Sequence, residues 1–312
     1  AHMMPNLLDK IGLDNWFFGV MFVMAVNTAI GMLIGIPFSW WEDMVHQKKW
    51  GFSTMTAKTF VTDLLKGLTI GLVLNGVLIG LLWWIIRSTD LWWLLGWAAI
   101  SVISVGFGIV YPRVIAPLFN KFKKLDNEQL HAKVLAVAHS VGADISTVEV
   151  EDTSKRDTRP NAYVGGAGKT RRMVVCDNML QWDDAELVSV CGHEIGHWRL
   201  KHLIKRIPLL LALQLVSFIA LKLIFSNESV LEFAGVKSLG DPGAVPLFFF
   251  FFSFPALVTG PIGSYLSRVH EREADLFGLE AVQDADAAAT AFRKLQEETI
   301  GDLSPSLWSR LN

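Results

Sequence analysis

The sequence predicts a mainly α-helical, polytopic membrane protein with about five transmembrane helices and a small α+β domain. Of its 312 residues, 52% are hydrophobic and only 19% are charged, whereas a soluble domain is usually nearer a quarter charged. The apolar residues gather in long uncharged stretches, and one long polar segment separates the third stretch from the fourth. The formal net charge of −2 gives no electrostatic reason to expect a nucleic-acid partner.

Five uncharged stretches are the candidate membrane spans. They cover Trp16–Trp41, Gly67–Ile86, Leu91–Pro112, Ile207–Leu221 and Pro242–Ser267. A helix crosses the hydrocarbon core of a bilayer in about 20 residues, so four of the stretches are long enough as they stand. The fourth is marginal, and a buried core helix is the alternative for it. We therefore expect an integral, multi-pass protein whose helices contact the lipid bilayer.

The basic residues indicate the orientation in the membrane. Lysines follow the first stretch, and the polar segment 111–206 carries Lys and Arg along its length, whereas the connections 87–90 and 226–241 contain few. With five spans, all the basic segments fall on one side of the membrane. The positive-inside rule then places the polar segment in the cytoplasm.

These features divide the chain into four parts. Residues 1–110 hold the first three spans with a cytoplasmic loop, and residues 111–206 form the cytoplasmic α+β segment. Residues 207–267 hold the last two spans, and residues 268–312 form a helical C-terminal segment.

The polar segment has the patterns of both helix and strand. Asn127–Val141 carries apolar residues near helical spacing. Three short pieces with strand character follow, at Thr147–Val150, Ala162–Val164 and Met173–Cys176. Asp183 with Glu186 three residues later is a capping-box pattern, which predicts the start of another helix.

That helix carries the pattern His193-Glu194-Ile195-Gly196-His197. Histidines four positions apart lie on one helix face, so both imidazoles can reach one metal ion. Zinc lowers the pKa of a bound water toward ~7, and Glu194 is placed to take the proton of that water as it attacks a carbonyl. The alternative is two surface histidines on an amphipathic helix. The helix cap, the glycine within the pattern and the apolar stretch that follows favour the metal site.

A catalytic zinc ion needs a third protein ligand, and Glu271 is the best candidate. Glu271 and Asp275 lie four residues apart after the fifth stretch, so they share a helix face. Glu271 would bind the metal, and Asp275 would accept a hydrogen bond from the far nitrogen of a ligand histidine. Glu273 is the weaker candidate, and His202 follows His197 too closely in the chain. A solvated helix start is the alternative for the acidic cluster.

In their order along the chain, these motifs resemble the type I CAAX prenyl proteases, integral-membrane zinc metallopeptidases of the gluzincin type. The similar segments are HEIGHW with His202, EREAD from Glu271 to Asp275, the run 111–122, Ser154–Arg156, and Asn161-Ala162-Tyr163. The resemblance implies a peptidase that holds one zinc ion per chain with His193, His197 and Glu271, and that uses Glu194 as its general base.

The resemblance also implies how a substrate is held. Asn161, Ala162 and Tyr163 would form an edge strand that pairs with the backbone of an extended substrate. Arg268 and Tyr163 are candidates for supporting a metal ligand or polarising the scissile carbonyl. The alternative for Arg268 is an ion pair with one of the acidic residues that follow it.

Two features depart from the family pattern. Members of the family usually have seven spans, so we expect this chain to begin about two spans later than they do, with its membrane chamber open or completed by another subunit. His270 stands where an aromatic or apolar residue is expected. It is either a fourth polar group near the metal or a histidine on the helix face.

The function that these patterns indicate is a membrane-embedded zinc metalloendopeptidase acting on a peptide or protein, prenylated or membrane-associated. Peptide maturation and quality-control cleavage of membrane proteins are alternatives within that class. A catalytically silent membrane scaffold is the alternative of another class, and the presence of Glu194 argues against it. The sequence gives no indication of the oligomeric state or of the physiological substrate.

Overall fold

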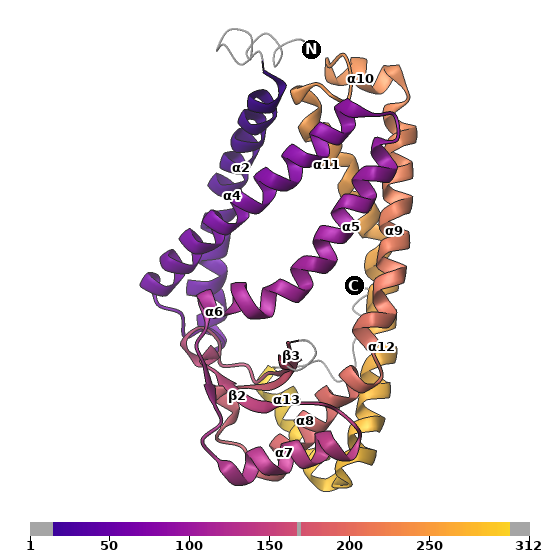
Figure 1. Ribbon diagram of the computed structural model, residues 1–312. Helices are drawn as coiled ribbons and strands as arrows, with labels where there is room; N and C mark the ends of the chain where they lie inside the picture. The colour runs from indigo at the N-terminus through magenta and orange to yellow at the C-terminus, as the bar shows by residue number, and fades with distance from the viewer. Residues whose placement is uncertain (1–14, 167–169, 300–312) are drawn as a thin grey trace. The chain divides into compact units, whose positions relative to one another are not determined.

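A computed structural model describes residues 15–166 and 170–299 of the chain (Figure 1). The chain folds into two compact units. The first unit takes the described residues of Ala1–Glu42, Phe60–Val105 and Leu209–Thr259. The second takes the described residues of Asp43–Thr59, Gly106–Pro208 and Gly260–Asn312.

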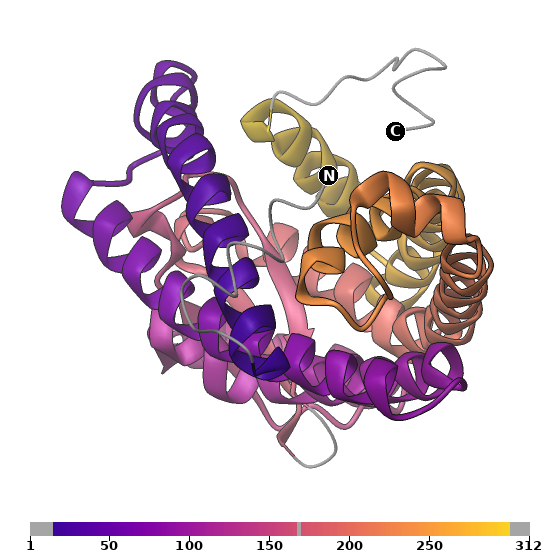
Figure 2. The same ribbon diagram turned by 90° about the horizontal axis from the view of Figure 1, so that it is seen from above.

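Long apolar helices build the first unit. They are α2 (Trp16–Trp41), most of α4 (Ala57–Ser88), most of α5 (Trp92–Val110), most of α9 (His202–Phe225), α10 (Glu228–Ala234), the 3₁₀ turn Pro242–Ala244, α11 (Val245–Ser253) and the start of α12 (Pro255–Val282). Figure 2, which looks down on the ribbon, shows several of these helices nearly end-on. Asn15 caps the first of them, because its side chain accepts a hydrogen bond from the N–H of Phe17.

Four helices in the described part of the chain are long and apolar enough to cross a membrane: Trp16–Lys49, Ala57–Ser88, Trp92–Phe119 and His202–Phe225. Many of their large apolar side chains face outward, with Leu33 77% and Val102 73% exposed. Such exposure is unfavourable in water and expected in lipid. The marginal fourth stretch is thus a full-length helix of 24 residues, and the alternative of a buried core helix is wrong.

The fifth predicted span is two helices and not one. Within Pro242–Ser267, α11 ends at Ser253 and α12 begins at Pro255. Pro255 has no backbone N–H to continue the ladder, and its ring clashes with the preceding turn of a continuous helix. The first unit therefore contains a short apolar helix, α11, where the sequence predicted an unbroken span.

Aromatic packing and interhelical hydrogen bonds hold the first unit together. Trp83 is fully buried, and its ring centroid lies 5.4 Å from that of Phe248. The indole N–H of Trp97 on α5 donates to the carbonyl of Leu211 on α9 over 2.9 Å. Such bonds matter between membrane helices, because lipid supplies no hydrogen-bonding partner.

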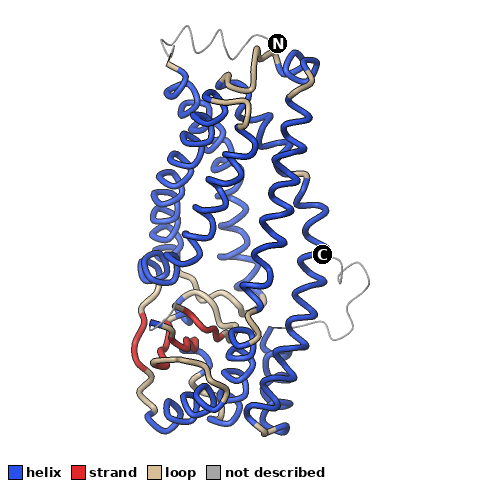
Figure 3. The backbone as a smooth tube through the Cα atoms, turned by 45° about the vertical axis from the view of Figure 1, so that its right-hand side comes forward, coloured by secondary structure: helices blue, strands red, loops and turns tan. Residues whose placement is uncertain are grey.

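The second unit combines a small sheet with helices. Its strands are β1 (Phe122–Lys124), β2 (Thr147–Glu151), β3 (Ala162–Gly165) and β4 (Arg172–Cys176), which Figure 3 shows in red. Its helices are α3 (Gln47–Lys49), α6 (Ala116–Phe119), α7 (Glu128–Ser140), α8 (Asp184–Arg199), α13 (Ala285–Thr299) and the remaining parts of α4, α5, α9 and α12. Two π-helical turns, Glu42–His46 and Tyr111–Ile115, and two 3₁₀ turns, Thr153–Lys155 and Asp177–Met179, complete the elements.

The strand order in the sheet is β1-β2-β4-β3. Strand β2 runs parallel to β4, while β1 and β3 pair antiparallel at the two edges. The three strands and the helix predicted between residues 127 and 176 are confirmed within a residue or two. Strand β1 was not predicted, and α13 lies in the helical C-terminal segment expected over residues 268–312, where the sequence patterns did not indicate its bounds. The sheet leaves β3 at an edge, where it pairs only with β4 among the described strands.

Helices α7 and α8 share one hydrophobic core with the sheet. Val134 of α7, Val148 of β2, Met173 of β4 and Ile195 of α8 are each at most 1% exposed and belong to one cluster. Burial of an aliphatic side chain of this kind stabilises a fold by about 1.5–3 kcal/mol. The core therefore fixes α8 as a rigid element of the second unit.

Candidate metal centre

Helix α8 begins with the predicted capping box. The side chain of Asp183 accepts from the backbone N–H of Glu186, and the carboxylate of Glu186 accepts from the N–H of Asp183 over 3.1 Å. Lys294 of α13 forms an ion pair with the same buried carboxylate. The start of the helix is thereby fixed, about two and a half turns before His193 and Glu194.

Glycines let α8 and α12 cross at very short distance. A Cβ added to Gly278 of α12 would lie 2.9 Å from the backbone nitrogen of His193, and one added to Gly196 would lie 3.2 Å from the carbonyl oxygen of Ala274. One added to Gly192 would lie 2.6 Å from a methyl of Val282. At Gly278 the neighbours are backbone atoms, so a side chain there would force the helices apart. The close approach brings Glu271 to the two histidines.

Three ligand atoms converge at the crossing. The Nε2 atoms of His193 and His197 lie 3.0 Å apart. The Oε2 atom of Glu271 lies 3.3 Å from the first and 3.5 Å from the second. Ligands about 2.1 Å from a tetrahedral zinc ion lie roughly 3.4 Å from one another. The spacing and chemistry of these side chains therefore fit zinc, and the structure brings together the three predicted ligands.

The charges at the site favour the binding of a cation. Hydrogen bonds from His193 and then from His197 hold the pKa of the Glu271 carboxyl well below its usual range. Glu194 is in the opposite situation: burial raises its pKa to about 7, although the two imidazoles act to lower it. Glu271 is thus always a charged ligand, whereas Glu194 is poised to exchange a proton near neutral pH.

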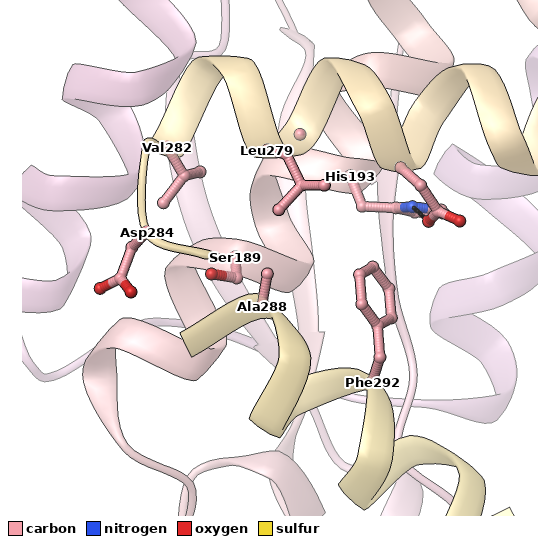
Figure 4. A pocket seen from close by; sticks show the side chains of 9 residues that line it. Ser189, His193, Leu279, Val282, Asp284, Ala288 and Phe292 are labelled. Atoms are coloured by element: carbon pink, nitrogen blue, oxygen red, sulfur yellow. Dashed lines mark ion pairs between the residues drawn. The ribbon is translucent and has the colours of Figure 1, made fainter. Parts of the chain in front are cut away.

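Asp275 lies on the other side of the His193 ring. Its Oδ1 atom is 2.8 Å from Nδ1 of His193, and the approach is not a well-aligned hydrogen bond. Apolar side chains restrain the same ring: Phe292 of α13 contacts it edge-on, with centroids 6.0 Å apart. Figure 4 shows Phe292 facing His193, with Leu279 and Val282 lining the small cavity beside it.

Comparison with known proteins identifies the family. The family model described as "Peptidase family M48" matches residues 124–312. The chain belongs to peptidase family M48. A second model, described as "CAAX prenyl protease N-terminal, five membrane helices", matches residues 3–121. The chain is accordingly an integral membrane protein, and its family implies a metal ion.

Individual M48 relatives agree with this assignment. A CAAX prenyl protease 1 homolog of Dictyostelium discoideum is 32% identical over 288 residues, covering 88% of this chain and 66% of the relative. The uncharacterized metalloprotease YhfN of Bacillus subtilis is 27% identical, covering 92% of this chain and 67% of the relative. The crystal structure of S. mikatae Ste24p has the same fold, with a TM-score of 0.84, 24% identity and coverage of 93% and 71%. The chain spans about two thirds of the length of the curated relatives that it matches.

The M48 site opens onto a cavity of about 350 Å³. Glu194, Glu271 and His193 line it, together with Asn161 and Ala162 at the start of β3. The other side of the cavity is lined by Phe292, Leu295 and Gln296 of α13. A helical C-terminal segment was expected, but the sequence did not indicate that α13 lines the site; the spacing of its buried Ala288 and Ala291 is a helical signal for a face packed on the protein.

Strand β3 presents free backbone groups beside this cavity. The N–H of Cys176 donates to the carbonyl of Asn161 over 3.0 Å. Bonded and non-bonded pairs alternate in an antiparallel ladder, so the N–H and C=O of Ala162 and Val164 point away from β4. The side chain of Tyr163 lies elsewhere, because its hydroxyl donates to Glu151 over 3.0 Å.

The remaining predicted residue, Arg268, is half-buried on α12, and its side chain forms no hydrogen bond or ion pair with any described residue. His270 is buried rather than on an open helix face, and its ring stacks on His202 at 4.2 Å. The sequence did not indicate that His202 reaches the site. Its Nδ1 atom lies 2.9 Å from Nδ1 of His197.

Proposed function

We propose that this chain is a zinc-dependent membrane endopeptidase, in which His193, His197 and Glu271 hold the ion and Glu194 is the general base. One observation carries the proposal. Three ligand atoms from two helices lie 3.0–3.5 Å apart, at the spacing that zinc requires, beside the half-buried carboxylate of Glu194, which does not belong to the ligand set.

Each of these residues has a separate role in peptide hydrolysis. When bound, zinc supplies activation of a water molecule and polarisation of the scissile carbonyl. Glu194 accepts the proton of the attacking water and returns it to the leaving amine nitrogen, for which a pKa near 7 suits a base at neutral pH. Asp275, 2.8 Å from Nδ1 of His193, keeps that imidazole oriented toward the ion.

Strand β3 supplies the means to hold a peptide. An extended substrate adds to the free edge at Ala162 and Val164, so that its backbone forms the next strand. Asn161 and Ala162 line the same cavity as Glu194, which supports a binding mode with the scissile bond near the general base. In this scheme Tyr163 contributes its position in the strand, and Arg268 has no assigned partner.

The proposed substrate is a peptide or protein that is prenylated or membrane-associated, cleaved at the cytoplasmic face. The names of several relatives, CAAX prenyl protease 1, support prenylation, and the distribution of basic residues supports the orientation. Peptide maturation and quality-control cleavage use the same chemistry on other substrates. A silent scaffold would have no use for the half-buried carboxylate of Glu194.

The Glu194→Gln variant tests the proposal. It is expected to retain one zinc ion per chain and to lose cleavage, because the amide cannot accept the proton. The full chain in detergent micelles is offered two peptides of identical sequence, one prenylated and one not, and the products are identified by mass spectrometry. Glu280→Gln, at an exposed position of α12, is the matched control. Undiminished turnover by Glu194→Gln would rule out the mechanism.

A further inference from the structure

A second cluster of histidine and carboxylate side chains lies next to the proposed zinc site. His202, His270 and Glu273 bring ligand atoms within 4.8 Å of one another. The Nε2 atom of His202 lies 3.0 Å from Oε2 of Glu273, and His202 is only 3% exposed. By composition alone, this cluster resembles a second metal site.

The geometry of the two rings argues against a shared ion. The rings of His202 and His270 are stacked at 4.2 Å with an interplanar angle of 5°. An imidazole binds a metal with a lone pair in the plane of its ring, and nearly parallel planes do not meet at a common point. An ion between these histidines would lie outside the plane of at least one of them.

The position of hydrogen atoms gives a second argument. A neutral imidazole carries one N–H and one lone pair. If His197 offers the lone pair of Nε2 to zinc, its hydrogen is on Nδ1, which faces Nδ1 of His202 at 2.9 Å. His202 must then accept at Nδ1 and carry its own hydrogen on Nε2. That hydrogen points to Glu273, so His202 has no lone pair left for a metal.

We infer that His202 and Glu273 are positioning residues, which hold His197 in the tautomer and orientation that the zinc site requires. The inference rests on the proposed zinc site. His197 reaches a carboxylate through one additional ring, whereas His193 meets Asp275 directly at 2.8 Å. Both ligand histidines thus have an acidic partner behind them, as metal-binding histidines usually do.

The backbone between the two helices is built for this contact. Helix α8 ends at Arg199, and Lys201 adopts φ +58° before α9 begins at His202. A non-glycine residue pays an energetic cost in this left-handed region. The turn folds His202 back to His197, only five residues earlier, and no regular helix would bring the two Nδ1 atoms together at that spacing.

Zinc affinity of the full chain tests the inference, measured in detergent by competition with a chromophoric chelator. His202→Ala is expected to raise the Kd for zinc about 10- to 100-fold, with one zinc per chain at saturation. His202→Gln is expected to recover most of the loss, since an amide oxygen can accept from His197 and the amide NH₂ can donate to Glu273. His139→Ala, which removes an exposed histidine of α7, is the matched control and is expected to leave the Kd unchanged.

Three outcomes would overturn the inference. The first is a His202→Ala variant with the Kd of the wild-type protein, and the second is a His202→Gln variant no better than His202→Ala. The third is a wild-type protein with two tightly bound zinc ions, one of which disappears in His202→Ala, because that result makes the cluster a metal site. A wild-type protein that binds no zinc would instead refute the proposed function itself. The absorption spectrum of the cobalt-substituted variants separates a changed ligand field from a general loss of fold.

Discussion

The crossing of α8 and α12 makes Gly278→Ala a sharp test of how the site is built. The added Cβ would lie 2.9 Å from the nitrogen and 3.1 Å from the Cα of His193, whereas ordinary contacts begin near 3.4 Å. Both neighbours are backbone atoms, so no side chain can turn aside. The helices must separate by about half an ångström or more, yet zinc–ligand distances tolerate only about ±0.2 Å.

The size of the effect follows from packing. Overfilling a tightly packed site costs about 1–3 kcal/mol, and the greater helix propensity of alanine offsets about 1 kcal/mol of that in overall stability. The zinc-bound state cannot relax by moving α12, so it bears the full cost. The Kd for zinc is therefore expected to rise roughly 5- to 150-fold, with little change in the unfolding temperature of the metal-free protein.

The assay is chelator competition on the purified chain, with Gly263→Ala as the control. Gly263 lies on the same helix, and a Cβ there would meet nothing within 4 Å, so its zinc affinity is expected to equal that of the wild-type protein. If Gly278→Ala and Gly263→Ala bind zinc equally well, the close crossing does not position Glu271, and the account of the site is wrong.

The remaining predictions concern the carboxylates. Glu271→Ala is expected to lower the zinc content by elemental analysis, whereas Glu273→Ala keeps one zinc per chain at saturating metal; equal content in both would require another third ligand. In the metal-free protein, the rise of the Glu194 pKa from 4.5 to about 7 destabilises the fold by roughly 3 kcal/mol above pH 7 and not at all below pH 4.5. Glu194→Gln is thus expected to unfold at a higher temperature than the wild-type protein at pH 8 and at the same temperature at pH 4; an equal midpoint at pH 8 would contradict the burial of this charge. For the zinc-bound enzyme, kcat/KM is expected to fall as the pH is lowered and Glu194 becomes protonated. This fall is expected below pH 7, because the cation lowers the pKa of Glu194. A kcat/KM that keeps rising toward pH 5 would exclude Glu194 as the base.

Local patterns in the sequence predicted much of this structure, because they have local physical causes. The capping box at Asp183 and Glu186 and the helical spacing of His193 and His197 depend only on neighbouring residues. The apolar stretches likewise predicted four of the long helices. Such features need no knowledge of the tertiary fold, and the structure contains them as expected.

Other features depend on contacts between distant parts of the chain. The glycine at 196 was visible in the motif, but its partner, the backbone of α12 near Ala274, was not. The approach of His202 to His197 depends on a left-handed residue at Lys201, for which lysine itself gives no signal. The break at Pro255 had a visible cause, and the uninterrupted apolar composition around it led to the prediction of one span.

The most direct test of the account is anomalous scattering at the zinc absorption edge from crystals of the zinc-saturated full chain. The account predicts one strong peak about 2 Å from Nε2 of His193, Nε2 of His197 and a carboxylate oxygen of Glu271. A peak among His202, His270 and Glu273 in its place, or no peak near His193 and His197, would contradict it.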